Sequence, residues 1–591
     1  MTVDLPTPAT PTRRRWLAPF ALAVLLGGLF FLRLGQDVPL RSHEALLATS
    51  ARNMYLDRPV QLADGSRPSP WLLPNFNDVP RLRKAPLLYW MVAGLAYLTG
   101  AVDEWTARLP SALAAVGTVL LVLALVRRWL DPPVAYWAAA TLATSVGFMV
   151  IARQALADMP MTFFTTASLA AVWLGVERSG PRRFGWIVLA GAAAGLAMLA
   201  KGPTPAVVFP LPYLAAAVLV VARLVRARRA GQPVGAEWAW TLGGAAAASA
   251  LFLVIVLPWP AYVYLHVPEA LKIWKAESVD RSTGDYGHAE PPHFYLTRLP
   301  MLLLPWTLFF VCGLILAAQR WRRQTTDRAW LLFVAAWLVG PLAAFSLAAG
   351  KQDHYILPIF PAAAVYIALG LRPLLAPAPS RARTVARVLL VSFGVGAILL
   401  GLGGVAAYAL NPAKPHVPAD GGGSALYLTP AVLRPAAAIG GLAILGGLTV
   451  IVMAARRRWR AGLVVAVTAL AAGFLVAWPT LIGPMDRSVT AAEFARYVQQ
   501  TVPAGVPVYS MDAPNNTVVF YVERPLAALA GPEGVRSELA RGHSFFLICN
   551  SRQRPFLEDR SGLAPLFHKN NLYKPDEGFW LFHAAATNPP K

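Results

Sequence analysis

The sequence predicts an all-α protein that crosses a lipid bilayer many times and carries a small α/β domain at its C-terminal end. Hydrophobic residues make up 56% of the 591 residues and charged residues only 14%, whereas soluble domains carry about 25% charge. Apolar runs near the length of a membrane-spanning helix recur along most of the chain. From residue 483 onward this pattern gives way to shorter runs that are typical of strands.

Thirteen segments are predicted to span the membrane. The first follows three arginines and precedes no small-residue cleavage site, so it is expected to be a retained helix and not a cleaved signal peptide. The apolar run 85–98 is too short to cross and is expected to lie at the outer interface or to be re-entrant. The predicted spans are 16–34, 109–126, 134–152, 159–176, 185–199, 205–222, 238–260, 300–317, 329–348, 355–374, 388–410, 434–454 and 462–482.

Arginine predicts the orientation of these spans. Every second loop between them is rich in arginine, and such loops stay on the cytoplasmic side. The N-terminus is therefore predicted to be cytoplasmic, and loops 35–108, 261–299 and 411–433 are predicted to lie outside together with the C-terminal tail. This topology, with attraction to anionic lipids, accounts for the excess of 53 basic over 30 acidic residues. We expect a multi-pass protein of a bacterial-type inner membrane and no nucleic-acid partner.

Two domains are predicted. Residues 1–482 form the membrane domain, whose outer loop 35–108 carries interfacial helices, and residues 483–591 form an extracytoplasmic α/β domain. Neither Cys312 nor Cys549 belongs to a metal-spaced pair, so no disulfide and no cysteine metal site are expected. The tail is predicted to have strands at 506–509, 517–521, 545–548 and 579–582, a helix at 491–501 with Thr490 as a possible cap, and a helix at 532–540.

Candidate site residues concentrate at the predicted outer ends of the spans, whereas the inner loops hold mostly arginine. Ionisable residues in such places are functional candidates by default. Glu44 and Arg52 are eight residues apart and so share a helix face. The candidates for catalysis are His43, Glu44 and Asp158, and those for binding a substrate are Arg52, Arg83, Lys84, Tyr89, Lys201, His288, His293, Lys351 and Tyr355.

Carboxylates, cations and aromatic rings beside lipid suit a phosphate-linked lipid donor. Lysine and arginine bind the phosphate leaving group and stabilise its developing charge. A carboxylate takes a proton from an acceptor hydroxyl, and tyrosines stack on a sugar or line an isoprenoid groove. Each candidate also has a purely structural alternative: Glu44 could pair with Arg41 or Arg52, and Asp158 could cap a helix.

Several motifs resemble the bacterial branch of glycosyltransferase family 39, which includes protein O-mannosyltransferases and the lipid A aminoarabinose transferase. Residues 43–54 resemble its opening acidic motif, and residues 71–90 resemble its signature "W-L-V-P-x-x-N-G-x-P…E-K-P-P-L-x-Y-W". Residues 107–112, 200–203 and 351–358 are similar to three further motifs, and Asp158 stands where the family has an outer-loop acid. The resemblance covers residues 16–375, and beyond them the chain resembles the aminoarabinose transferase only in layout.

The resemblance implies a GT-C fold and transfer of a sugar from a polyprenyl-phosphate donor to a lipid, glycan or protein. Three residues depart from the motifs: His43 replaces an Asp, Arg83 replaces a Glu that can be a metal ligand in the aminoarabinose transferase, and Ala85 replaces a Pro. No metal ligand is therefore predicted, and a divalent cation stays an open alternative. The rival functions are an inactive protein that binds a glycan or partner and a lipid transporter, although no two matching halves with broken helices are evident.

Overall fold

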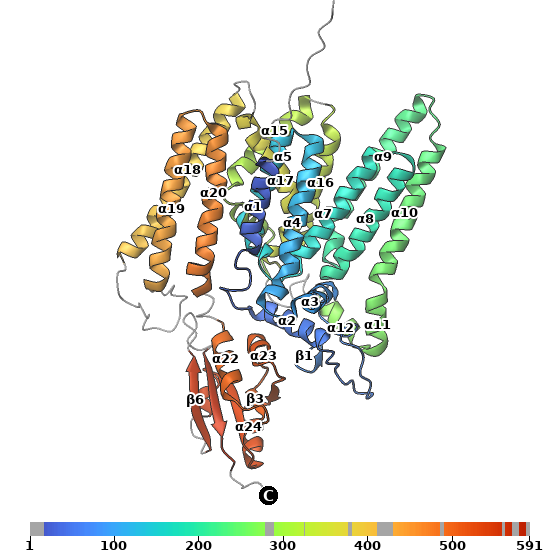
Figure 1. Cartoon of the computed structure of the whole chain (residues 1–591). Helices are drawn as coiled ribbons and strands as arrows, with labels where there is room; N and C mark the ends of the chain where they lie inside the picture. The colour runs from blue at the N-terminus through green and yellow to red at the C-terminus, as the bar shows by residue number, and fades with distance from the viewer. Residues whose placement is uncertain are drawn as a thin grey trace, which may run out of the picture.

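The computed structural model describes residues 17–277, 289–323, 325–375, 381–410, 430–484, 490–557, 562–569 and 578–586. Long helices lie side by side in one bundle, and a small sheet domain lies beyond one end of it (Figure 1). Short helices of the first predicted outer loop lie between the two parts (Figure 1). The chain is thus a multi-pass membrane protein with a small C-terminal α/β region, as the sequence predicts.

Within the described residues, ten helices are long and apolar enough to cross a membrane, and two bent pairs of helices bring the number to twelve. With the shorter apolar helix α1 (Leu17–Phe31), they coincide with the thirteen predicted segments. The ten helices are α4 (Glu104–Trp129), α7 (Asp158–Glu177), α8 (Gly180–Lys201), α9 (Pro210–Arg229), α10 and α11 (Gly235–His266), α16 (Arg328–Leu347), η4 and α17 (Asp353–Leu375), α18 (Arg381–Leu410), α19 (Pro430–Ala455), and α20 and η5 (Trp459–Ile482).

Each of the two bent pairs corresponds to one predicted span that is broken into two helices. The first joins α5 (Pro132–Ala143) to α6 (Val146–Ala152) at 65°, and the second joins α14 (Phe294–Leu302) to α15 (Thr307–Arg323) at 110°. Pro305 lies in the second break, where it removes a backbone donor that a continuous helix needs. The second break turns the chain sharply, so α14 lies at the end of the bundle near the predicted outer loops.

The run 85–98 forms the 13-residue helix α3 (Leu87–Thr99), which ends at Gly100 with a left-handed φ of 83°. Helix α2 (Ser42–Tyr55) packs against α3, and the hairpin of β1 (Asn75–Phe76) and β2 (Val79–Pro80) follows α2. With α12 (Ala270–Lys275), these elements cover the end of the bundle that faces the sheet domain (Figure 1).

The C-terminal sheet has the strand order β4-β3-β5-β7-β6. Its first three strands are parallel, and β7 pairs antiparallel with both β5 and β6. The elements are α22 (Ala492–Thr501), β3 (Val508–Met511), α23 (Asn516–Val522), β4 (Ala527–Leu529), α24 (Gly531–Ala540), β5 (Phe545–Asn550), η6 (Arg554–Phe556), β6 (Leu563–Lys569) and β7 (Phe579–Ala584). The predicted strands at 506–509, 545–548 and 579–582 and the helix at 532–540 are confirmed.

The predicted strand 517–521 is wrong, because these residues form helix α23. Asn515 caps that helix by accepting from the amides of Thr517 and Val518, at 2.9 and 3.4 Å. A short apolar run fits a buried strand and a buried helix equally well, so periodicity alone could not separate them. The proposed cap at Thr490 is also wrong: α22 begins at Ala492, and the Thr490 hydroxyl has no hydrogen-bond partner among the described residues.

Helix α23 docks the C-terminal region onto the membrane part. The Tyr521 hydroxyl accepts from the Leu40 amide at 2.9 Å and donates to Glu104 at 2.8 Å. The Asn77 amide group pairs with both backbone groups of Leu526, at 2.7 and 2.9 Å. These contacts join residues more than 400 positions apart, and they fix the sheet domain beside the start of α2.

A buried ion pair anchors α2 to the span α4. Arg108 donates from Nε to Glu44 Oε1 at 2.9 Å and from Nη2 to Oε2 at 3.1 Å, and both side chains are at most 4% exposed. The same guanidinium donates to the carbonyls of Leu34, Val38 and Pro39. The Glu44 carboxylate also accepts from the amides of Arg41 and Ala155, at 3.1 and 2.8 Å. Glu44 therefore ties together three segments, and each of its oxygens is occupied.

Glycines allow spans to approach closely. A Cβ at Gly370 of α17 would overlap the carbonyl of Phe309 on α15, and a Cβ at Gly313 of α15 would overlap the carbonyl of Tyr366 on α17. Close packing contributes to the association of helices in lipid, and small residues at the interface allow it. The contact between α15 and α17 thus depends on these two positions.

We predict that Gly370→Ala lowers the midpoint of thermal unfolding of the detergent-solubilised protein, because overpacking a helix contact costs about 1–3 kcal/mol. Gly473→Ala on α20 is the matched control, since no atom lies within 4 Å of the added methyl group. Alanine there should leave the midpoint unchanged or raise it. Equal midpoints for the two variants would contradict the close approach of α15 and α17.

We also predict that Glu44→Gln destabilises the protein by about 3–5 kcal/mol, because it leaves Arg108 charged, buried and unpaired. Burial raises the pKa of the Glu44 carboxyl, but Arg108 and the hydrogen bonds more than offset this, so the net pKa lies below its ordinary value. The stability it contributes is therefore present above the unfolded pKa of about 4.3 and lost as the pH falls through the folded pKa.

Thermal unfolding of the wild type and Glu44→Gln, recorded between neutral and acidic pH, tests this prediction. The gap between their midpoints should narrow as the pH falls. Glu533→Gln is the control, since that carboxylate is 76% exposed in its pair with Arg536 and exposed pairs contribute little. A Glu44→Gln variant as stable as this control would show that the buried pair is not an anchor.

Candidate active site

Asp158, Lys201 and His354 meet at one end of the helix bundle. Asp158 is 3% exposed and forms an ion pair with Lys201. The second carboxylate oxygen lies 3.8 Å from Nε2 of His354. The Lys201 ammonium also lies 4.4 Å from the centre of the Tyr355 ring, within the range of a cation–π contact. A carboxylate, an amine, an imidazole and a phenol ring thus form one group, called here the Asp158 cluster.

The fold brings the cluster together from segments that are distant in sequence. Asp158 is the first residue of α7 and Lys201 the last of α8, and these two helices pack as an antiparallel pair. A connection of two residues at their opposite ends therefore brings Asp158 and Lys201 to the same level. His354 and Tyr355 lie in η4, which packs against α7. The buried Tyr295 of α14 supports η4 by donating to the Gln352 carbonyl at 3.0 Å.

Lys84 and His43 border this cluster. Lys84 interacts electrostatically with Asp158, and His43 does so with His354. Nζ of Lys84 lies 3.5 Å from a Glu277 oxygen, and Arg83 lies 3.9 Å from the other oxygen. The side chains of Lys84 and Arg83 are 44% and 54% exposed. They can therefore turn toward an incoming anion at modest cost, because exposed pairs are weak.

The remaining candidates lie apart from the cluster or support it. Lys351 is buried and donates to the Glu290 carbonyl at 2.6 Å. Burial lowers the pKa of Lys351 by more than the nearby Glu290 raises it, so the net pKa lies below its ordinary value. Tyr89 is buried within α3, and His293 is exposed just before α14. His288 lies outside the described residues.

Two predicted roles gain no support from the geometry. The Glu44 carboxylate is enclosed with Arg108, so it fits a structural anchor better than a base that must reach an acceptor. Arg52 donates to the Phe520 carbonyl at 2.7 Å and to the Val102 carbonyl at 3.1 Å, and its guanidinium lies 4.0 Å from the centre of the Phe520 ring. Arg52 therefore holds α23 in place. Because the Glu44 carboxylate is enclosed, Asp158 is the better placed carboxylate of the two.

The sequence reasoning missed three residues that shape this region. His354 stands between candidates at 351 and 355, and only its place in that motif could have singled it out. Arg108 resembles a helix-end arginine until the fold buries it beside Glu44. Glu277 lies about 190 positions from Lys84, and no spacing rule connects them. Among the residues the structure describes, no three His, Cys, Asp or Glu side chains gather as a metal site.

Comparison with known families and structures identifies relatives. Residues 67–276 match the family described as dolichyl-phosphate-mannose-protein mannosyltransferase. Undecaprenyl phosphate-alpha-4-amino-4-deoxy-L-arabinose arabinosyl transferase from Pseudomonas aeruginosa UCBPP-PA14 is 32% identical over 358 residues. The enzyme of the same name with the numeral 2, from Pseudomonas fluorescens Pf0-1, is 28% identical over 353 residues. Each match covers 58% of this chain. The chain spans 57% of the first relative's length and 58% of the second's.

The fold has a solved counterpart that covers both parts of the chain. The crystal structure of ArnT from Cupriavidus metallidurans bound to undecaprenyl phosphate superposes with a TM-score of 0.75 at 20% identity. It covers 98% of this chain and 100% of that chain, whereas its apo state gives a TM-score of 0.71. The chain therefore has the GT-C fold, and its resemblance to glycosyltransferase family 39 is confirmed.

Proposed function

We propose that this chain transfers a sugar from an undecaprenyl-phosphate-linked donor to an acceptor at the outer face of the inner membrane. The observation that carries the proposal is the Asp158 cluster, in which a buried carboxylate meets Lys201 with Lys84 nearby. The names of the relatives supply the donor class, since they describe transferases that act on an undecaprenyl-phosphate-linked pentose. The arginine-rich inner loops support the outward orientation.

Lys201 and Lys84 are suited to bind the phosphate that leaves in the reaction. Attack of an acceptor oxygen on the anomeric carbon breaks the bond from that carbon to the phosphate, and the phosphate leaves with the bonding electrons. Lys201 and Lys84 stabilise the charge that develops on it, and Arg83 lies close enough to Lys84 to assist. Lys201, whose side chain is 11% exposed, acts more strongly there than it would in water.

Asp158 is suited to accept the proton of the acceptor hydroxyl. In the proposed step the proton of the acceptor hydroxyl passes to the Asp158 carboxylate, and an acceptor phosphate would need no such transfer. When the phosphate draws Lys201 away, Asp158 loses its ion-pair partner and becomes a stronger base. His354, at 3.8 Å from the carboxylate, can orient it or accept the proton onward. The acceptor is a hydroxyl or phosphate group on a lipid, glycan or protein.

We predict that Asp158→Asn and Lys201→Met each reduce product formation by roughly 100-fold or more, the scale of losing a general base or a charge that stabilises the leaving group. Lys84→Ala should reduce it less, because Lys84 lies at the exposed border of the cluster. The measurement is mass spectrometry of envelope lipids and glycans from cells lacking the gene, complemented with each variant. Wild-type complementation should restore one missing sugar.

Arg536→Ala is the control, since this arginine is exposed on α24 and, within the described residues, forms its ion pair with Glu533 of the same helix. It should restore the sugar fully at equal protein abundance in the membrane. If Asp158→Asn and Lys201→Met also restored it fully, the cluster would not be the reaction site. If deletion of the gene removed no sugar, the chain would be an inactive binding protein or a transporter.

A further inference from the structure

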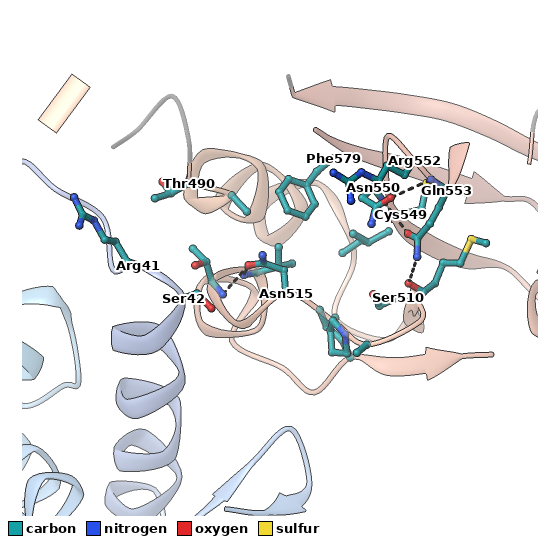
Figure 2. Close-up of a pocket in the computed structure, with 18 residues that line it drawn as sticks. Arg41, Ser42, Thr490, Ser510, Asn515, Cys549, Asn550, Arg552, Gln553 and Phe579 are labelled. Carbon is teal, nitrogen blue, oxygen red and sulfur yellow. Dashed lines mark hydrogen bonds between the residues drawn. The ribbon is translucent and has the colours of Figure 1, made fainter. Parts of the chain in front are cut away.

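A cavity lies between the C-terminal sheet and the start of α2. Its volume is about 600 Å³, enough for a sugar with an attached anion. Figure 2 shows Asn550, Arg552 and Phe579 on the sheet side of this cavity, and Ser42 with Asn515 on the side nearer the membrane part. The proposed transfer step uses none of these residues.

The topology of the sheet places this cavity where α/β domains bind ligands. Strand β3 lies between its parallel neighbours β4 and β5, so the chain leaves β3 to one side and later returns on the other. Ligands of open α/β sheets bind outside the carboxyl ends of the strands at such a reversal point. The cavity is lined by Ser510 and Met511 at the end of β3 and by Cys549 and Asn550 at the end of β5.

The walls of the cavity are held by hydrogen bonds between the two strand ends. The Gln553 side chain donates to the Met511 carbonyl at 3.0 Å and to Asp512 at 2.9 Å. Asn550 and Gln553 also exchange side-chain and backbone hydrogen bonds of 2.9 and 3.0 Å. These contacts fix the cavity before a ligand enters, which lowers the entropy lost on binding.

The lining has the chemistry of a site for an anionic, hydroxyl-rich molecule. It contains two arginines, Arg41 and Arg552, together with hydroxyl and amide side chains, and its described lining includes no Asp or Glu. Phe579 adds an aromatic ring, which suits the face of a sugar.

We propose that this cavity binds a phosphorylated sugar, presented either as a soluble molecule or as the headgroup of a glycolipid. Arginine recognises phosphate with paired hydrogen bonds, and the hydroxyl and amide groups match sugar hydroxyls. Ser42 lines the cavity and accepts from Asn516 at 2.9 Å, and its neighbour His43 interacts with His354 of the Asp158 cluster. The cavity therefore lies beside the first residue of α2.

The test is saturation-transfer NMR on the full-length protein in phosphatidylcholine nanodiscs, with glucose 1-phosphate as the probe. Glucose 1-phosphate should bind, and equimolar glucose should bind at least tenfold more weakly. Arg552→Ala should weaken the binding at least tenfold, and Ala513→Trp, which fills the exposed rim of the cavity, should abolish it. Arg536→Ala is the matched control and should bind as the wild type does.

The outcomes separate this proposal from the transfer reaction and separate the two sources of ligand. Asp158→Asn should bind the probe as tightly as the wild type, so a failure of the proposed transferase function leaves this test intact. Displacement of the probe by a phosphorylated glycolipid in the nanodisc supports a lipid headgroup, and its absence supports a soluble ligand. Binding that glucose matches would overturn the proposal. So would binding that survives both Arg552→Ala and Ala513→Trp in a protein that also carries Lys201→Met, which removes the phosphate ligand of the proposed transfer site.

Discussion

The buried ion pair between Glu44 and Arg108 is the constraint on which the arrangement of the predicted outer region depends. It joins the first residues of α2 to the beginning of a membrane span, and the Ala155 amide brings the segment before α7 to the same carboxylate. Removing one member of such a pair destabilises the protein, because the other member stays charged in a medium of low polarity. The position of α2 relative to Asp158 follows from this pair.

That position links the two parts of the molecule. His43 of α2 interacts electrostatically with His354 of the Asp158 cluster, and α2 also contacts α23 through Arg52 and Ser42. These contacts hold the sheet domain at a fixed place beside the proposed site.

The sequence alone predicted the spans well, because lipid imposes one length and one composition on every crossing helix. It predicted the C-terminal sheet in part: periodicity identified β5 and β7 and mistook α23 for a strand, since a short buried run has no distinguishing period. For the site, helix ends predicted that Asp158 and Lys201 lie on one side, and the structure brings them into contact. The roles of Glu44 and His354 could not be predicted, because burial and pairing at such sequence separations depend on the whole fold.

The central claim is that the Asp158 cluster and Lys84 form the place where the phosphate of a lipid donor binds. An electron cryo-microscopy structure of the full-length protein in nanodiscs with undecaprenyl phosphate tests this claim most directly. We predict that the phosphate lies within hydrogen-bond distance of Lys201 or Lys84. A phosphate bound at the opposite face of the membrane, or at a groove that contacts neither lysine, would contradict it.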